Sequence, residues 1–87
     1  MKTFEDLEFK PHTSGYGSRA RIDFNNGYGA SIVFGNMFYS NGIDTYELAV
    51  MKDGDLCYSS GITNDVIGYI TKDEVTEYMK QIQELED

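Results

Sequence analysis

Few residues in this 87-residue chain could do acid–base or nucleophilic chemistry. It holds one histidine, His12, and one cysteine, Cys57. In a Ser-His-Asp or Cys-His catalytic centre, residues distant in the sequence would have to meet at His12, and no local pattern indicates that they do. Cys57 lies in the stretch DLCYSS, an expected short strand, where a cysteine is more often a small core residue than a nucleophile. The sequence therefore predicts no catalytic residue and no enzymatic activity.

Metal and cofactor sites are not predicted either. The turn Asp53–Asp55 places two carboxylates around a glycine, but a calcium loop needs further ligands at fixed spacing. The glycine-rich stretch that begins at Gly27 resembles a dinucleotide fingerprint only in part. Ile32 stands where the third glycine is needed, and a strand follows instead of a helix. We expect neither a metal ion nor a cofactor.

The same stretch, NGYGAS at residues 26–31, begins like the RNA-recognition signature. Asn26 replaces its basic residue, however, and Ala30 replaces its second aromatic residue. The net charge of −8 also removes the attraction for phosphate. We therefore expect no direct binding of nucleic acid. The stretch instead indicates a hairpin, in which Gly29 permits a bulge or a close neighbouring strand.

The charge is unevenly distributed along the chain. Residues 1–43 hold four acidic and four basic residues, whereas residues 44–87 hold eleven acidic residues and three lysines. Such a field repels nucleic acid and anionic membranes and favours encounter with a basic protein surface. Solubility alone is the other explanation of the acidic half.

Alternating apolar and polar residues predict strands over the first two thirds of the chain. The residue types between them are typical of turns, and Asn25-Asn26-Gly27 is the strongest hairpin signal. Proline at position 11 should close the first, edge strand. The expected strands cover residues 6–12, 18–24, 28–35, 45–51 and 56–60.

The end of the chain changes to a helical period. Thr71 and Glu74 form a capping box that fixes the start of a helix. Segment 61–70 is compatible with a short helical turn or a brief strand. The result is a single α+β domain over residues 1–87, an antiparallel β-meander of four to five strands with one C-terminal amphipathic helix packed on one face. The apolar stripe of that helix consists of Val75, Tyr78, Met79, Ile82 and Leu85.

Nothing in the sequence indicates a membrane or secreted protein. No run approaches the roughly 18 apolar residues that span a bilayer. Acidic residues interrupt the N-terminal stretch MKTFEDLEFK, where a signal peptide needs a continuous apolar core. The single cysteine cannot form an internal disulfide and fits a reducing compartment. We expect a cytoplasmic protein.

The hairpins do not explain the loop at residues 36–43, which carries three consecutive large residues, Met37, Phe38 and Tyr39. These side chains either plug one end of the core or form an exposed contact patch. In the second case they would be apolar anchors beside acidic residues of the C-terminal half. The predicted partner-binding residues are Phe38, Tyr39, Asp44, Glu47, Asp53, Asp55 and Asp65.

The stretches NGYGASIV, TYELAV and ITNDVIGYIT, the D-G-D turn and the final helix together resemble small acidic bacteriophage-encoded proteins, several kinds of which inhibit CRISPR–Cas systems. The resemblance covers residues 4–85. It implies a non-enzymatic inhibitor in the cytoplasm of an infected bacterial host. Such an inhibitor binds a CRISPR–Cas effector, presents carboxylates where phosphates would sit, and blocks nucleic-acid binding or cleavage.

A second hypothesis is a small phage or prophage accessory or protein-interaction domain that has no inhibitory role and can form a homodimer. Proteins of the anti-CRISPR type share size and charge more than fold, so the resemblance names no individual target.

Overall fold

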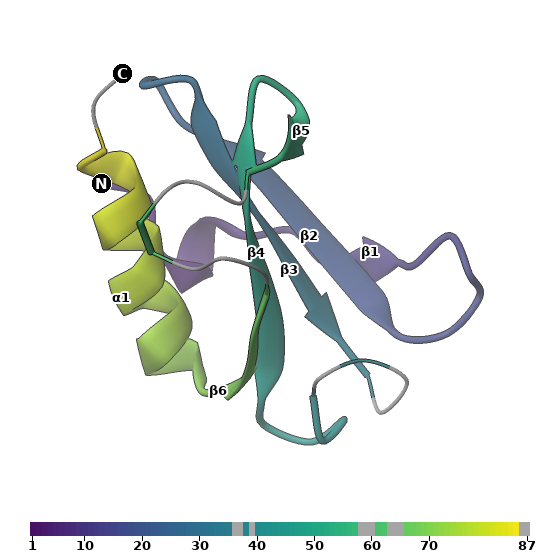
Figure 1. Cartoon of the computed structure of the whole chain (residues 1–87). Helices are drawn as coiled ribbons and strands as arrows, with labels where there is room; N and C mark the ends of the chain where they lie inside the picture. Colours follow the sequence, from purple (N-terminus) through teal and green to yellow (C-terminus); the bar gives the residue numbers. More distant parts are fainter. Residues whose placement is uncertain (36–37, 39, 58–60, 63–65, 86–87) are drawn as a thin grey trace.

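One antiparallel sheet and one helix build the structure (Figure 1). The computed structural model describes residues 1–35, 38, 40–57, 61–62 and 66–85. The predicted α+β class, with a meander and a C-terminal helix, is confirmed. The elements are the 3-10 helix η1 (Phe4–Asp6), strands β1 (Lys10–Pro11), β2 (Ser18–Asp23), β3 (Tyr28–Phe34), β4 (Tyr46–Lys52), β5 (Asp55–Leu56) and β6 (Val66–Ile70), and helix α1 (Lys72–Gln83).

Strands β1 to β5 are neighbours in chain order, and β6 pairs with β4. The predicted turn between β2 and β3 is closed by the Phe24 N–H, which donates to the Tyr28 carbonyl at 2.7 Å. The second tight turn, between β4 and β5, uses Asp53 and Gly54, both with positive φ. This two-residue turn matches the twist of the flanking strands, whereas the β2–β3 turn has three residues between Phe24 and Tyr28, of which Gly27 has positive φ. Local turn chemistry therefore sets the order of the central strands.

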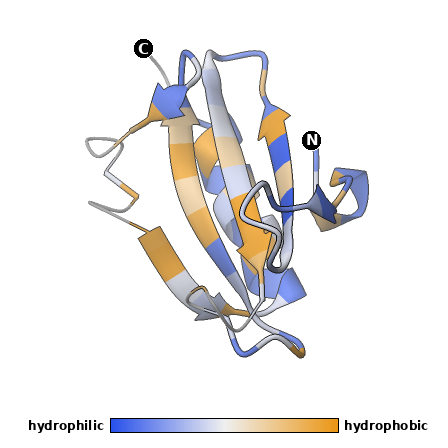
Figure 2. Ribbon diagram, turned by 90° about the vertical axis from the view of Figure 1, so that its right-hand side faces the viewer, coloured by the Kyte–Doolittle hydropathy of each residue, from blue (hydrophilic) through white to orange (hydrophobic). Residues whose placement is uncertain are grey.

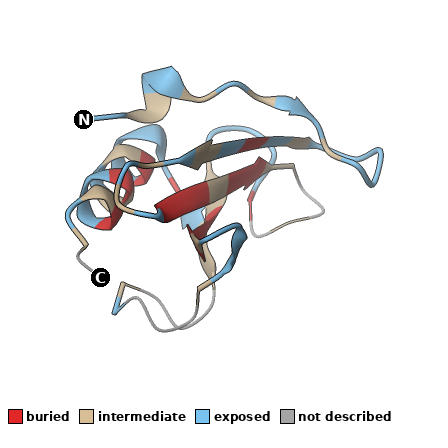
Figure 3. Ribbon diagram, turned by 90° about the horizontal axis from the view of Figure 1, so that it is seen from above, coloured by how far each residue is buried: buried red, intermediate tan, exposed pale blue. Residues whose placement is uncertain are grey.

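The core lies between α1 and one face of the sheet. In the view of Figure 2 the helix lies behind the sheet, and Figure 3 shows buried residues on both layers. Three residues of the predicted helical stripe are fully buried, and Tyr78 and Leu85 are half-buried against them. The buried cluster consists of Tyr28, Ala30, Ile32, Leu48, Val50, Ile70, Val75, Met79 and Ile82.

The predicted capping box begins helix α1. The Glu74 N–H donates to Thr71 Oγ1 at 3.4 Å, and Glu74 Oε1 accepts from the Thr71 N–H at 3.0 Å. Both bonds satisfy main-chain donors that the first helical turn leaves without partners. No helix among the described residues is long and apolar enough to cross a membrane.

The first strand is much shorter than predicted. Only Lys10 and Pro11 pair with β2, whereas the sequence predicts a strand over residues 6–12. The reason is that Phe4 and Phe9 both pack against the ring of Tyr46 on the helix side of the sheet, with ring centroids 5.1 and 5.8 Å away. The N-terminal segment therefore follows the core instead of the edge of β2.

Strand β4 is buried on both faces, unlike the alternating pattern predicted for it. Ala49 and Met51 lie on the face away from α1, yet each is only 7% exposed. Strand β4 is central, so residues of β3 on one side and of β5 and β6 on the other flank its side chains on both faces. Position in the sheet, which a single sequence does not give, explains the difference.

Gly29 serves the close approach of two strands. Its partner is Asp23, and the register between β2 and β3 runs without a bulge. A Cβ atom at Gly29 would lie 2.6 Å from the carbonyl oxygen of Ile22 and 2.8 Å from Asp23 Oδ1. Of the two predicted roles for this glycine, the close neighbouring strand is therefore the one observed.

Segment 61–70, which the sequence leaves open, contains a strand. Residues 66–70 form β6, antiparallel to β4. The strand predicted at 56–60 is observed only at its beginning, since β5 ends at Leu56. Residues 58–60 and 63–65 lie outside the described residues.

The helix placement leads to a stability prediction. Ile82 is fully buried, so Ile82→Ala should lower the free energy of unfolding by about 2–5 kcal/mol in a urea titration. Gln81→Ala, at the exposed neighbouring position, is the control and should change it by less than about 0.5 kcal/mol. A loss that small at Ile82 would contradict the packing of α1 on the sheet.

Candidate protein-binding site

The structure separates the predicted acidic residues into two groups. Asp44 lies just before β4 and Glu47 near its start, whereas Asp53 lies in the turn after β4 and Asp55 begins β5. At about 3.3 Å per residue, Glu47 and Asp53 are about 20 Å apart along the strand. The predicted residues therefore do not form one cluster. Tyr39 and Asp65 lie outside the described residues.

Phe38 packs inward. Its ring is half-buried, and the centroid lies 4.9 Å from that of His12. A Cβ atom at Gly17 would come within 2.9 Å of the Phe38 ring, so the loop that contains His12 and Gly17 covers this side chain. For Phe38 this position agrees with the first of the two alternatives, a side chain that packs against the fold. Its use as a binding anchor stays a prediction.

The loop before β4 is held by a buried serine. Ser40 is 3% exposed, and its hydroxyl donates to the Thr45 carbonyl at 2.6 Å. The same oxygen accepts from the N–H groups of Gly35 at 3.2 Å and Gly42 at 3.1 Å. One side chain therefore joins the end of β3 to the loop that enters β4.

Asn41 fixes the other half of that loop. Its Oδ1 accepts from three consecutive main-chain N–H groups, those of Ile43, Asp44 and Thr45, at 2.9 to 3.1 Å. Its Nδ2 donates to Asp44 Oδ1 at 2.8 Å. Asparagine side chains commonly organise turns in this way. The result is that Ile43, 80% exposed, projects into solvent from a well-bonded loop.

A β-bulge places a tyrosine near the same end of the sheet. Tyr46 pairs with Ile70 and Leu48 with Ile67, so Glu47 alone lies opposite the two residues Gly68 and Tyr69. Tyr69 has φ 56 and is 61% exposed. Positive φ is strained for a bulky residue, and bulges redirect side chains. At this bulge the Tyr69 ring is turned to the surface.

These residues form what we call the bulge surface, defined by Ile43, Asp44, Glu47 and Tyr69. Figure 1 shows that the start of β4 and the end of β6 lie side by side. Two exposed apolar side chains beside carboxylates resemble the composition of protein interfaces more than that of a catalytic centre. The prediction from sequence did not include Ile43 or Tyr69, although Gly68 inside the strand-like run VIGYI signals a bulge.

Tyr46 connects this surface to the core. Burial raises the pKa of its hydroxyl above the ordinary value of 10.0, and the negative charge of Asp44 raises it further. The ring contacts Phe34 at a centroid distance of 5.1 Å. The folded state therefore favours the neutral form of the Tyr46 hydroxyl.

The raised pKa of Tyr46 predicts a pH dependence of stability. The folded state favours the neutral hydroxyl, so its contribution is complete below about pH 10 and is lost as the pH rises through the folded-state pKa. When the pH is raised from about 8 to about 11, the free energy of unfolding should therefore fall less for Tyr46→Phe than for the natural chain. Equal losses in urea titrations at the two pH values would contradict this linkage.

The histidine forms a local hydrogen-bonded turn. His12 Nδ1 lies 2.8 Å from Ser14 Oγ and accepts from the Ser14 N–H at 3.0 Å. Among the described residues no carboxylate forms an ion pair with His12, so no third group orients the ring. This serine–histidine pair is typical of turn stabilisation. Within the described part of the chain, no group of histidine, cysteine and acidic side chains could hold a metal ion.

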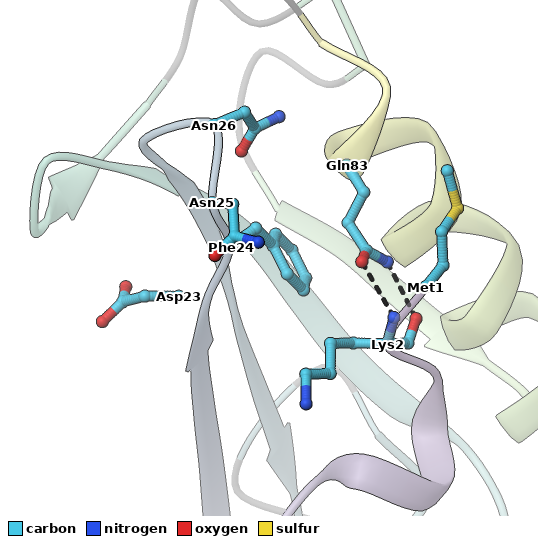
Figure 4. A pocket seen from close by; sticks show the side chains of 7 residues that line it. All are labelled: Met1, Lys2, Asp23, Phe24, Asn25, Asn26 and Gln83. Atoms are coloured by element: carbon cyan, nitrogen blue, oxygen red, sulfur yellow. Dashed lines mark hydrogen bonds between the residues drawn. The ribbon is translucent and has the colours of Figure 1, made fainter.

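A hollow of about 430 Å³ lies at the opposite end of α1 (Figure 4). The Gln83 side-chain amide forms two hydrogen bonds with the main chain of Lys2, at 2.8 and 2.9 Å. Asn26 Nδ2 donates to the carbonyls of Ile82 and Leu85 at the end of the helix. These amides tie chain segments together, so we do not assign a ligand to this hollow.

Comparisons of the chain with protein-family models, with curated proteins and with solved structures found no match. Function is therefore inferred from the residues and the geometry of the chain itself.

Proposed function

We propose that the protein is a non-enzymatic binding protein that docks on a basic, nucleic-acid-binding surface of another protein and blocks access of nucleic acid. The bulge surface is the observation that carries this proposal. Tyr69 is exposed on strained backbone, and Ile43 is exposed on a loop fixed by Ser40 and Asn41. Strained backbone and exposed apolar side chains are concentrated at functional surfaces.

The charge of the chain supports a basic partner. A net charge of −8 attracts a positively charged surface over a distance of about 8–10 Å at physiological salt. Asp44 and Glu47 place two of the carboxylates at the bulge surface, next to the apolar anchors. Charges of this kind raise the association rate, whereas buried apolar anchors slow dissociation. The site thus combines both elements of a tight complex.

The resemblance to anti-CRISPR proteins makes a bacterial CRISPR–Cas effector the specific partner in this proposal. Such an effector holds nucleic acid in a positively charged channel that reads backbone geometry. The carboxylates of the bulge surface would replace phosphates there, and the proposal involves no cofactor and no catalytic step.

Tyr69 provides the test of the apolar anchor. Tyr69→Asn removes the ring but keeps a residue that tolerates positive φ, so the fold should be retained. In surface plasmon resonance with an effector captured from host lysate and identified by mass spectrometry, this variant should dissociate at least about tenfold faster.

Tyr16→Asn is the matched control, because Tyr16 is 62% exposed but lies in the loop between β1 and β2. It should dissociate at the natural rate. Equal dissociation rates for the Tyr69 and Tyr16 variants would contradict the placement of the site. A stable dimer that captures no host protein would favour the accessory-domain hypothesis instead.

Asp44 provides the test of electrostatic steering. Asp44→Asn removes the charge and keeps an oxygen acceptor for the Asn41 amide, so the loop should be preserved. Association should slow and become less sensitive to salt, with dissociation little changed. Asp73→Asn, on the exposed side of α1, carries the same charge change and should have the smaller effect. A larger effect at Asp73 would place the binding surface on the helix.

A further inference from the structure

A hollow with basic side chains lies at the β1–β2 edge of this acidic protein. It has a volume of about 320 Å³. Its lining residues are Glu8, Lys10, Pro11, Arg19 and Arg21. Three of the seven basic residues of the chain therefore meet in one place, although the chain carries a net charge of −8.

The register of the strands puts these three cations on one face. Lys10 lies directly opposite Arg19, and directly opposite residues of an antiparallel pair share a face. Arg21 is two residues further along β2 and points the same way. Ala20 is buried between the two arginines on the core side, so the cations lie on the face away from α1.

These cations lack close ion-pair partners among the described residues. Among the described residues, neither Lys10 nor Arg19 forms an ion pair, and the Arg21–Asp23 pair is long, at 4.0 Å. Arg21 Nη2 donates to the Gly54 carbonyl at 3.2 Å, which leaves most of the guanidinium donors unused. Like charges directly opposite each other destabilise a sheet. An anion bound between Lys10 and Arg19 would relieve this repulsion.

We propose that this hollow binds two acidic side chains of an extended segment from a partner protein. Arg19 and Arg21 are separated by two strand positions, which is about 6.6–6.8 Å. Side chains at alternate positions of an extended peptide have the same spacing. A segment of the form acidic–any–acidic would therefore place one carboxylate on each guanidinium, with Lys10 beside the first. Arginine binds carboxylates through paired N–H donors.

The surrounding acids favour a peptide over a nucleic acid. Glu8 lines the hollow itself, and Asp23, Asp53 and Asp55 lie around Arg21 and the turn that it contacts. A nucleic acid carries a phosphate at every nucleotide and would place some of them beside these carboxylates. A peptide carries charge only where its sequence places it. The hollow shares no lining residue with the bulge surface and is opposite to it in sign, so this proposal does not depend on the proposed function.

A titration followed by ¹⁵N–¹H NMR tests the site with two synthetic peptides of equal composition. Capped Ser-Glu-Ser-Glu-Ser has the matching spacing, and capped Glu-Ser-Ser-Ser-Glu does not. The first should shift the amide signals of Arg19 and Arg21 and should bind at least about fivefold more tightly than the second. Its binding should weaken as salt rises, because exposed charges are screened.

Two double variants show whether the peptide binds at this hollow or is attracted to positive charge anywhere on the protein. The double variant Lys10→Gln, Arg19→Gln should bind the first peptide at least about tenfold more weakly. Its melting temperature should not fall, since repulsion is removed. The variant Lys72→Gln, Lys80→Gln makes the same charge change on exposed positions of α1 and should bind normally.

Three results would overturn the proposal. The first is equal affinity of the natural chain for the two peptides. The second is an equal loss of affinity for the matching peptide in the two double variants. The third is tighter binding of a short oligothymidylate than of the matching peptide.

Discussion

The packing of α1 on the centre of the sheet is the constraint on which the rest of the structure depends. Met79 and Ile82 are fully buried against Leu48 and Val50 of the central strand. The Thr71 cap starts the helix one residue after β6 ends at Ile70, so the end of β6 is fixed by the start of the helix. Strand β6 must also pair with β4, and the bulge opposite Glu47 accommodates its extra residue. The exposure and strain of Tyr69 thus follow from the demands of the core.

The two charged surfaces have different structural origins. The bulge surface depends on contacts within one end of the sheet, where Ser40 and Asn41 order the loop that presents Ile43 and Asp44. The cationic hollow depends on the pairing of β1 with β2, which sets Lys10 against Arg19. Neither feature improves the stability of the isolated chain, because one exposes apolar side chains and the other opposes like charges. Binding of partner molecules is the explanation that we propose for both.

Sequence patterns predict the parts of the fold that local chemistry determines. The β2–β3 turn, the β4–β5 turn and the Thr71–Glu74 capping box are each set by a few neighbouring residues and occur as predicted. Patterns fail where distant segments decide the outcome. Phe9 joins the core through Tyr46 instead of extending a first strand, and Met51 is buried because β4 is central. The sequence does not identify Tyr69 and Ile43 as exposed apolar residues for the same reason, since a bulge depends on strand register and the exposure of a loop residue depends on the hydrogen bonds that hold the loop.

A hydrogen-exchange footprint of the protein bound to its captured partner would locate the binding surface. Amide exchange would be measured by mass spectrometry for the free protein and for the complex. New protection is expected at residues 40–47 and 66–70, around the bulge surface, with little change on the exposed side of α1. Protection concentrated on residues 72–83, with none at 40–47 and 66–70, would contradict it.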